Sequence, residues 1–493
     1  MFQQPLQNKF LLNCTMLVCL LFLAGPICYA TNTNTNTNTN TNTNTNTNTN
    51  DTLDIRPYPW IRQDLNQIQF YGSSLKDFVE LFQKISDLEN GSDESVKIIH
   101  FGDSHLQADF LSNKFRELIN QFFHLPRPSI RNFIFPYSVA HTNSLLPYRF
   151  KEQGYFNSFR NTTSTNPLPL GISGFCLSTK DTNANLEITC PSSENFQYNI
   201  HRIFAFHSFD SGAWMPKIVA NTNTKANNAN NANDNPPSIS TSENTEVEIQ
   251  RFPSLGCSVF DFSTPCDKFT YYFSKADNNS YSGENHWGKL YGLWMQNIGS
   301  SLSYNNLGVN GACIKSFLKC QYLGRELKII APQAIFISLG TNDAYHGFDS
   351  VNFVKDYSSF ITQLRENAPN AAILLITPGD YLINRKNKNP KLPILIRAIE
   401  TVAELNNCAL WNFYEIGGGK NSIRQWFSHG LAGKDQLHLI RKGYELSGEL
   451  LFKAFFSAYK KEHYSNLNIF PNTNTTNDSD TVLRKHYSNT EKF

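Results

Sequence analysis

No block of basic residues, and no apolar run long enough to cross a bilayer comfortably, is present in this chain of 493 residues. The formal net charge is only +2, so we expect no nucleic-acid partner. The mostly apolar stretch from Phe10 to Ala24 is short for a membrane span. It follows Lys9 and precedes small residues near Ala30, a pattern typical of a secretory signal. We predict a cleaved signal peptide over residues 1–30 and no stable membrane span after cleavage, with an uncleaved anchor as the alternative.

Metal-ligand patterns are also missing. No CxxC pair and no Cys/His cluster has the spacing of a metal site, so we predict no metal and no cofactor. Three of the ten cysteines lie in the predicted signal, which leaves seven. In an oxidising compartment Cys176 with Cys190, and Cys257 with Cys266, could close local hairpins. Because seven is an odd number, at least one thiol stays unpaired.

Three segments are polar and poor in apolar side chains. They are a Thr-Asn repeat, for which we predict a disordered spacer over residues 31–55, an Asn-rich stretch at 221–246, and a polar C-terminal tail at 463–493. Such segments cannot bury enough apolar surface to offset the entropy lost on ordering. Around four hundred residues remain, enough for two cores of ordinary size.

Two kinds of periodicity divide the remaining chain. Apolar residues recur at helical spacing from Ser74 to Ile85 and from Phe110 to Phe122, on either side of the apolar strand "KIIHF". The alternation returns downstream, where the strands "QAIFISL", "AAILLITP" and "CALWNFY" are separated or followed by helices predicted over Val351–Asn367, Ile394–Leu405 and Ile440–Lys460. Apolar strands alternating with helices predict a parallel sheet buried on both faces.

Between these two halves the pattern changes to short strands, such as "NLEITC", "VEIQRF" and "DKFTYYFS", separated by Asn, Gly, Ser and Pro. This pattern is typical of an antiparallel sandwich. We therefore predict an α/β domain made of residues 56–125 and 288–462, interrupted by an inserted antiparallel β-sandwich of jelly-roll type at 126–287.

One motif stands at the end of the first predicted strand of the α/β domain. Residues 98–110 read "IIHFGDSHLQADF", so Ser104 sits on a glycine-hinged corner between a strand and a helix. Gly-Asp-Ser is a common turn, and Asp103 can simply cap the helix. Alternatively Ser104 is a nucleophile, because ligands of open α/β sheets bind at the carboxyl ends of the strands.

A nucleophilic serine needs a base, a group that orients the base, and donors for the oxyanion. Asp435 and His438 lie three residues apart just before the last predicted helix, although this spacing also fits a helix N-terminus. Gly311 in "NLGVNGACIKSF" and Asn342 in "FISLGTNDAY" can supply donors, although both also fit ordinary turns. Each signal is weak alone, but all four occur in this chain, in the order Ser104, Gly311, Asn342 and then Asp435 with His438.

The blocks "FGDSH", "GVNGA", "LGTND" and "DQLH" together resemble those of the SGNH (GDSL-like) hydrolase family. The resemblance implies a flavodoxin-like three-layer fold. It further implies that Ser104 is the nucleophile and that His438 is the general base, oriented by Asp435. An oxyanion hole would be formed by the backbone amide of Ser104 with Gly311 and Asn342.

One position departs from the family pattern, because His105 stands where the family usually has Leu. Since His105 is adjacent to Ser104, we expect it to have a structural or supporting role rather than to act as the base.

Longer blocks, among them "RNFIFPYSVAHTNSLLPYRF" and "LYGLWMQNIGSSLSYNNLGVNGA", are similar to those of bacterial peptidoglycan O-acetylesterases. That group also carries a β-sandwich, likened to a carbohydrate-binding module, between the nucleophile and glycine blocks. The resemblance implies a serine esterase secreted across the inner membrane to the periplasm or cell envelope of a bacterium. Its substrate partner would be O-acetylated glycan, most specifically peptidoglycan, cleaved through an acetyl-enzyme on Ser104.

Other functions remain open at this point. The same site suits a lipase-like acylhydrolase, or an O-acetyltransferase acting on another glycan or a lipid. A surface glycan-binding protein without catalysis is a further alternative. The oligomeric state is not predicted.

Overall fold

The computed structural model describes residues 58–143, 148–190, 198–210, 212–220, 247–275, 287–299, 302–345 and 347–466. These residues belong to one compact unit, Leu53–Thr476. The predicted signal peptide (1–30), the spacer (31–55), the loop 221–246 and residues 467–493 of the predicted tail lie outside the described residues. Among the described helices, none combines the length and the apolar character that a membrane span requires.

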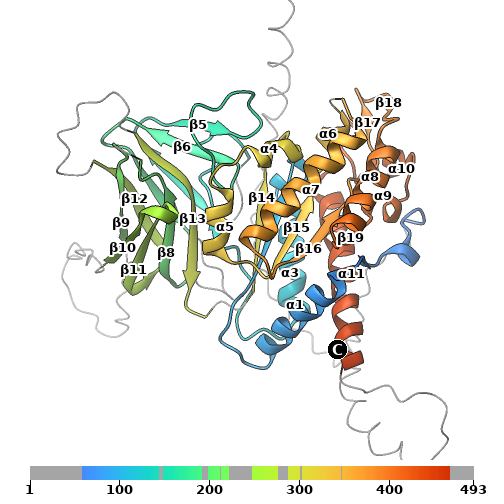
Figure 1. The fold of residues 1–493 in the computed structure, drawn as a ribbon, viewed down its shortest axis with the longest axis horizontal. Coiled ribbons are helices and arrows are strands. Elements are labelled where there is room, and N and C mark those ends of the chain that lie inside the picture. Colours follow the sequence, from blue (N-terminus) through green and yellow to red (C-terminus); the bar gives the residue numbers. More distant parts are fainter. Residues whose placement is uncertain are drawn as a thin grey trace, which may run out of the picture. The chain divides into compact units, whose positions relative to one another are not determined.

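A six-stranded sheet forms the centre of the α/β part (Figure 1). Its strands, in order across the sheet, are β1 (Gln69–Phe70), β19 (Ala409–Trp411), β16 (Ala372–Ile376), β15 (Ala334–Ser338), β2 (Val96–Gly102) and β14 (Leu302–Gly308). The last five are parallel, and β1 is antiparallel to β19 at the edge. Their nearly continuous apolar sequences agree with this arrangement, because parallel strands are buried on both faces.

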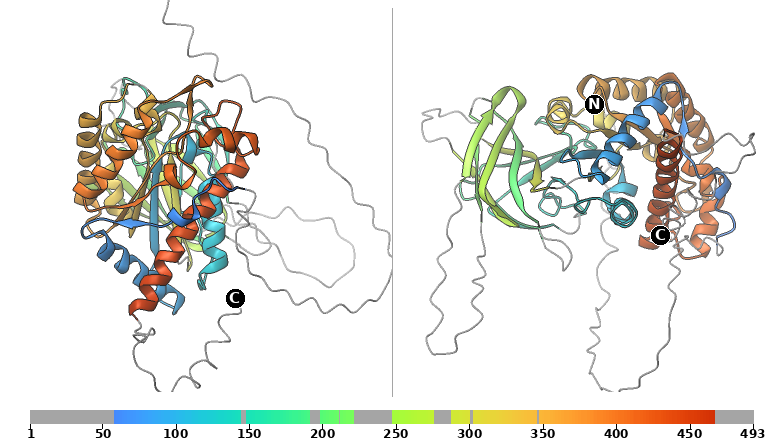
Figure 2. Two further views of the ribbon diagram at one scale, coloured as in Figure 1. Left: turned by 90° about the vertical axis from the view of Figure 1, so that its right-hand side faces the viewer. Right: turned by 90° about the horizontal axis from the view of Figure 1, so that it is seen from below.

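Helices cover both faces of this sheet. On one side, α1 (Ser74–Glu89) and α3 (Phe110–Phe122) pack against the long C-terminal helix α11 (Arg441–Asn466), as Figure 2 shows. On the other side lie α4 (Ile314–Leu318), α5 (Leu323–Ile330), α7 (Ser350–Asn367) and α8 (Leu392–Leu405). The remaining short helices are η1 (Gln63–Leu65), α2 (Ser104–Gln107), α6 (Thr341–Tyr345), α9 (Phe413–Ile416) and α10 (Ser422–Ser428).

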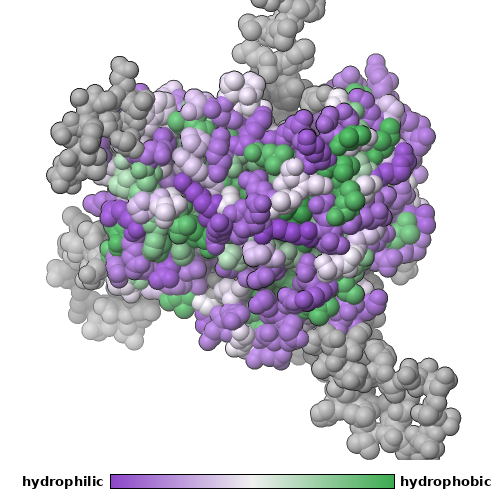
Figure 3. Space-filling view, viewed as in Figure 1, coloured by the Kyte–Doolittle hydropathy of each residue, from purple (hydrophilic) through white to green (hydrophobic). Residues whose placement is uncertain are grey.

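Neighbouring residues of one strand point into different cores. Ile98 and Phe336 belong to the apolar cluster under α1, α3 and α11, whereas Ile99 and Ile335 belong to the cluster on the opposite face. This alternation follows from the period of two in a strand. The surface seen in Figure 3 is mostly hydrophilic, with hydrophobic residues in small separate groups, which is ordinary for a protein surface in water.

The inserted segment forms two antiparallel sheets, drawn in cyan to yellow-green in Figure 1. The larger sheet contains β10 (Val247–Phe252), β11 (Cys257–Cys266), β8 (Ile200–His207), β13 (Gly288–Asn297), β6 (Phe175–Thr179) and β5 (Asn157–Arg160), with β3 (Phe133–Ile134) paired to β13. The smaller sheet contains β4 (Arg149–Gln153), β7 (Asn185–Thr189), β12 (Lys268–Ser274) and β9 (Met215–Ala220). A 3-10 turn, η2 (Pro253–Leu255), and a two-stranded hairpin of β17 (Leu382–Ile383) and β18 (Asn387–Lys388) complete the elements.

Two predicted boundaries are wrong. Strand β13 begins at Gly288 and pairs with β8, β6 and β3, so the sandwich extends to Asn297 rather than ending at 287. An apolar strand does not reveal its partner, and the sequence of β13 fits either sheet. Helix α11 also continues to Asn466, past the predicted end of the domain at 462.

The sandwich is not a separate unit. Its apolar residues, such as Phe175 and Tyr291, share one continuous core cluster with Leu323 and Leu327 of α5. All seven cysteines among the described residues are free thiols, so neither of the two hairpin disulfides considered above is formed.

Candidate active site

Three parallel strands end at the same edge of the central sheet and carry the predicted site. Gly102 at the end of β2 pairs with Gly308 of β14 and with Ser338 of β15. The chain continues from these strands to Ser104, Gly311 and Asn342 respectively. Because parallel strands present their carboxyl ends together, residues far apart in the sequence meet here.

The corner after β2 places Ser104 at the first position of α2. The buried Asp103 caps this helix, because its Oδ1 accepts a hydrogen bond from the His105 amide at 2.9 Å. The sequence allows two interpretations of this corner: a turn that caps the helix, or a turn that presents a nucleophilic serine. The cap is present, and it leaves the Ser104 hydroxyl facing His438.

Ser104, His438 and Asp435 form a hydrogen-bonded chain. The distance from Ser104 Oγ to His438 Nε2 is 2.9 Å, and that from His438 Nδ1 to Asp435 Oδ2 is 2.7 Å. An ionised carboxylate only accepts hydrogen bonds, so Nδ1 carries the proton. In a neutral ring Nε2 then has the free lone pair, and the Ser104 hydroxyl donates to it.

The charge of Asp435 is stabilised locally. Partial burial raises its pKa, but the hydrogen bond from His438 and those from the backbone amides of Leu437 and His438 outweigh burial and lower the pKa to about 2. The carboxylate therefore stays ionised at every ordinary pH and holds the imidazole in one tautomer.

The predicted oxyanion donors lie beside this chain. Gly311 has a φ of 81°, which is a conformation that favours glycine. Among the described residues, the backbone N–H groups of Ser104 and Gly311 have no hydrogen-bond partner. Asn342 Nδ2 donates to the Ala312 carbonyl at 2.9 Å, next to Gly311, and lies 3.4 Å from Asp103 Oδ2. The structure thus brings together all five predicted site residues.

His105 lies against the other histidine. Its ring is tilted on that of His438, with centroids 5.1 Å apart, and its Nδ1 is 3.1 Å from the Tyr444 hydroxyl. Burial lowers the pKa of His105, so the ring stays neutral beside His438. A structural or supporting role for His105 stays a prediction.

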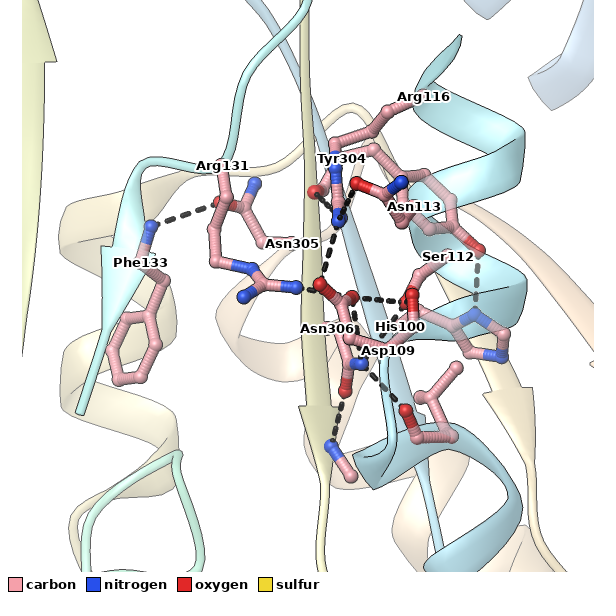
Figure 4. Close-up of polar contacts among 12 residues, drawn as sticks. His100, Asp109, Ser112, Asn113, Arg116, Arg131, Phe133, Tyr304, Asn305 and Asn306 are labelled. Atoms are coloured by element: carbon pink, nitrogen blue, oxygen red, sulfur yellow. Dashed lines mark hydrogen bonds and ion pairs between the residues drawn. The ribbon is translucent and has the colours of Figure 1, made fainter. Parts of the chain in front are cut away.

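A buried ionic network lies behind α2 (Figure 4). Asp109, at the start of α3, has a φ of 64°. Its carboxylate forms ion pairs with Arg116, at 2.8 Å, and with Arg131, and it accepts a hydrogen bond from Ser112 Oγ at 2.5 Å. Burial raises the pKa of Asp109, but the two guanidinium groups outweigh it and lower the pKa below its ordinary value.

This network is connected to the nucleophile helix through Asn306 of β14. The buried Asn306 Nδ2 donates to the Leu106 carbonyl at 2.6 Å and to Asp109 Oδ1 at 3.1 Å, and its Oδ1 accepts from the Gly308 amide at 2.7 Å. Asn306 therefore fixes both the end of α2 and the start of the Gly311 loop.

Replacing Asp109 by asparagine is expected to lower the free energy of unfolding by about 3–5 kcal/mol, because it leaves the buried guanidinium groups of Arg116 and Arg131 without a counter-charge. Urea unfolding measures the change. The matched control is Asp64→Asn, whose ion pair with Arg62 is exposed and should matter little. A loss no larger than that of the control would contradict this view of the network.

An apolar pocket lies next to the triad, and the space within it, including space open to solvent, is about 780 Å³. Its lining includes Ile376, Trp411, Ile423, Trp426, Leu439 and Tyr444. The pocket touches Asp103 and His105, on either side of Ser104, but neither Ser104 nor His438 lines it. It is therefore not the space into which the Ser104 hydroxyl points.

Metal ligands do not gather at this site. Within the part of the chain that the structure describes, no group of three or more His, Cys, Asp and Glu side chains could hold a metal ion.

The chain is similar to one protein family and to several solved structures. Residues 270–446 match the GDSL-like Lipase/Acylhydrolase family. A solved peptidoglycan O-acetylesterase is 17% identical and covers 80% of this chain and 99% of that chain, with a TM-score of 0.63. A lipase/acylhydrolase from Enterococcus faecalis is 21% identical over 33% of this chain and 78% of its own, with a TM-score of 0.27. No curated protein matches the chain.

The chain has the fold of an SGNH hydrolase, with a mixed six-stranded sheet and an inserted antiparallel sandwich. More specifically, residues 270–446 match the GDSL-like Lipase/Acylhydrolase family model, and this range begins within strand β12 of the sandwich. The resemblance and the fold class predicted from the sequence are therefore confirmed. The matched range includes Gly311, Asn342, Asp435 and His438, whereas Ser104 lies before it, on the other side of most of the insert.

Proposed function

We propose that this protein is a secreted serine esterase that removes O-acetyl groups from a cell-wall glycan, with peptidoglycan as the substrate. The observation that carries the proposal is the hydrogen-bonded chain from Ser104 through His438 to Asp435, placed beside free backbone amides. Support for the substrate comes from the similar peptidoglycan O-acetylesterase, because its fold aligns with that of this chain over 99% of the esterase's length. The proposal places the enzyme in the periplasm or cell envelope of a bacterium.

The first half of the reaction transfers the acetyl group to the enzyme. Ser104 Oγ attacks the acetyl carbonyl carbon while His438 Nε2 takes the hydroxyl proton, and Asp435 stabilises the resulting imidazolium. The N–H groups of Ser104 and Gly311, with the Asn342 amide, donate to the oxyanion. Loss of one such donor costs roughly 10²–10³ in kcat in comparable sites. The intermediate collapses, and the sugar oxygen leaves with the proton from His438.

The second half releases acetate. Water gives a proton to His438 Nε2 and attacks the acetyl carbon on Ser104. The second tetrahedral intermediate then collapses to acetic acid, which ionises to acetate in water, and Ser104 Oγ regains its proton from His438. Each half of the reaction begins with a neutral His438, which links the rate to pH.

The rate is expected to fall in acid. Histidine side chains take up a proton between roughly pH 8 and 5, and a protonated base cannot accept the Ser104 proton. Asp435 adds no further transition in this range, because its pKa is about 2 and it is already ionised. We expect kcat/KM for an aryl acetate to show a single acid limb, and a flat profile across this range would contradict the role of His438.

A carboxyl group near the site is a second cause of an acid limb that has to be tested. Burial raises the pKa of Asp343, next to Asn342, to about 7. The Asp343→Asn variant separates the two groups. The acid limb persists in this variant if His438 is the base, and it disappears if Asp343 causes it.

The proposed function is tested by acetate release from O-acetylated peptidoglycan, with the Ser104→Ala variant for comparison. We expect release by the native protein and none by the variant. If an aryl acetate is cleaved and peptidoglycan is not, the esterase stands and the substrate is wrong. If the acetyl-enzyme resists water but transfers its acetyl group to a hydroxyl of an added glycan, the protein is a transferase.

A further inference from the structure

Three segments of the chain meet at the side chain of Gln107, which is fully buried at the end of α2. Gln107 Oε1 accepts a hydrogen bond from the Asn310 amide at 2.5 Å. Gln107 Nε2 donates to Thr142 Oγ1 at 2.8 Å. Asn310 Nδ2 also donates to Thr142 Oγ1, at 3.3 Å. The nucleophile helix, the Gly311 loop and the inserted sandwich are thus joined by one triangle of hydrogen bonds.

The triangle lies directly next to the proposed oxyanion hole. Asn310 precedes Gly311, so the hydrogen bond from the Asn310 N–H to Gln107 fixes the peptide unit immediately before the one that carries the Gly311 N–H. The backbones of Gly308 and Gln107 also approach each other closely, because a Cβ placed at Gly308 would lie 2.4 Å from the backbone nitrogen of Gln107. The position of the Gly311 loop therefore depends on where the Gln107 side chain is held.

Thr142 is one of the hydrogen-bond partners of the Gln107 side chain. It lies on the loop that follows β3 of the sandwich, and it is half-buried. Its hydroxyl oxygen is the short acceptor for Gln107 Nε2. If the Thr142 hydroxyl is removed, Gln107 Nε2 keeps only its longer contact, 3.5 Å to the Asn143 carbonyl oxygen. A buried amide donor without a good acceptor shifts or takes up water.

We propose that Thr142, acting through Gln107 and Asn310, is a positioning residue that holds the Gly311 N–H in place for the oxyanion. On this view the inserted sandwich completes the oxyanion hole of the esterase, in addition to any contact it makes with a glycan. The expected effect on catalysis rests on the proposed function. The expected effect on the position of the Gly311 loop rests only on the hydrogen-bonded triangle.

The test compares Thr142→Val, which removes the hydroxyl at almost constant volume, with Thr142→Ser, which keeps it. With an aryl acetate, whose small size avoids glycan contacts, Thr142→Val should lower kcat about tenfold, which is less than the loss of a whole oxyanion donor. KM should change less than about twofold, as expected when only the transition state is affected. Thr142→Ser should restore most of kcat. The control Thr401→Val, on the exposed face of α8, should behave as the native protein.

Hydrogen–deuterium exchange supplies a readout that does not need activity. In Thr142→Val, amides of residues 308–312 should exchange faster than in the native protein, and in Thr142→Ser they should not. If kcat falls without faster exchange, or KM rises alone, Thr142 acts on the substrate and the proposal is overturned. It is also overturned if neither quantity changes. If the native protein cleaves no ester, the proposed function fails, and exchange alone decides whether Thr142 positions the loop.

Discussion

Replacing Ser104 by alanine should lower kcat for ester hydrolysis by roughly 10⁴-fold or more. Without the nucleophile, only substrate binding and the oxyanion hole remain to accelerate the reaction. The effect should be confined to activity. Among the residues that the structure describes, the Ser104 hydroxyl hydrogen-bonds to His438 alone, and Ser104 is only half-buried. Thermal unfolding of the variant should therefore match that of the native protein.

The comparison needs a serine that does not take part. Ser359→Ala removes a hydroxyl from the exposed face of α7, where it donates to the Lys355 carbonyl. This control should retain full activity. If Ser104→Ala kept more than about a tenth of the native kcat, the acetyl-enzyme mechanism would be contradicted, since such mechanisms lose orders of magnitude with the nucleophile.

Replacing Asp435 by asparagine should lower kcat by about 10⁴-fold through the tautomer of His438. The asparagine oxygen can still accept the amides of Leu437 and His438, which Asp435 Oδ1 accepts at 3.1 Å each. Its NH₂ group, however, would donate to His438 Nδ1 and move the ring proton to Nε2. A protonated Nε2 cannot accept the proton of Ser104.

Asp349→Asn is the matched control for this variant. Asp349 also caps two backbone amides, those of Val351 and Asn352, and no histidine among the described residues is its hydrogen-bond partner. Both variants should lose a similar small amount of stability in urea unfolding, and only Asp435→Asn should lose activity. A loss below about tenfold for Asp435→Asn would show that the carboxylate does not set the tautomer.

The residues that meet at the site could be predicted from the sequence, because each of them follows a strong local signal. "KIIHF" and "QAIFISL" are apolar strands, and parallel strands end together, so Ser104 and Asn342 had to lie at one edge. The Asp435 and His438 spacing is short enough for their side chains to touch within one turn of chain. These parts depend on local sequence, which is why they could be inferred.

Other parts depend on partners far away in the chain. The apolar strand β13 fits either sheet by its own sequence, and only its pairing with β8 assigns it to the sandwich. Gln107 and Thr142 carry no motif, since their role exists only where the insert meets α2. A weak signal was present in Asn305 and Asn306, because adjacent asparagines within an apolar strand must find buried partners.

The central claim is that Ser104 becomes acetylated during turnover. The most direct measurement mixes the native protein with an aryl acetate, quenches with acid during the burst of aryl alcohol, and maps the acetyl group by peptide mass. The account predicts an acetyl group on Ser104 in the native protein and none in Ser104→Ala. Turnover without acetylation of Ser104, or with acetylation of another residue that persists in Ser104→Ala, would contradict it.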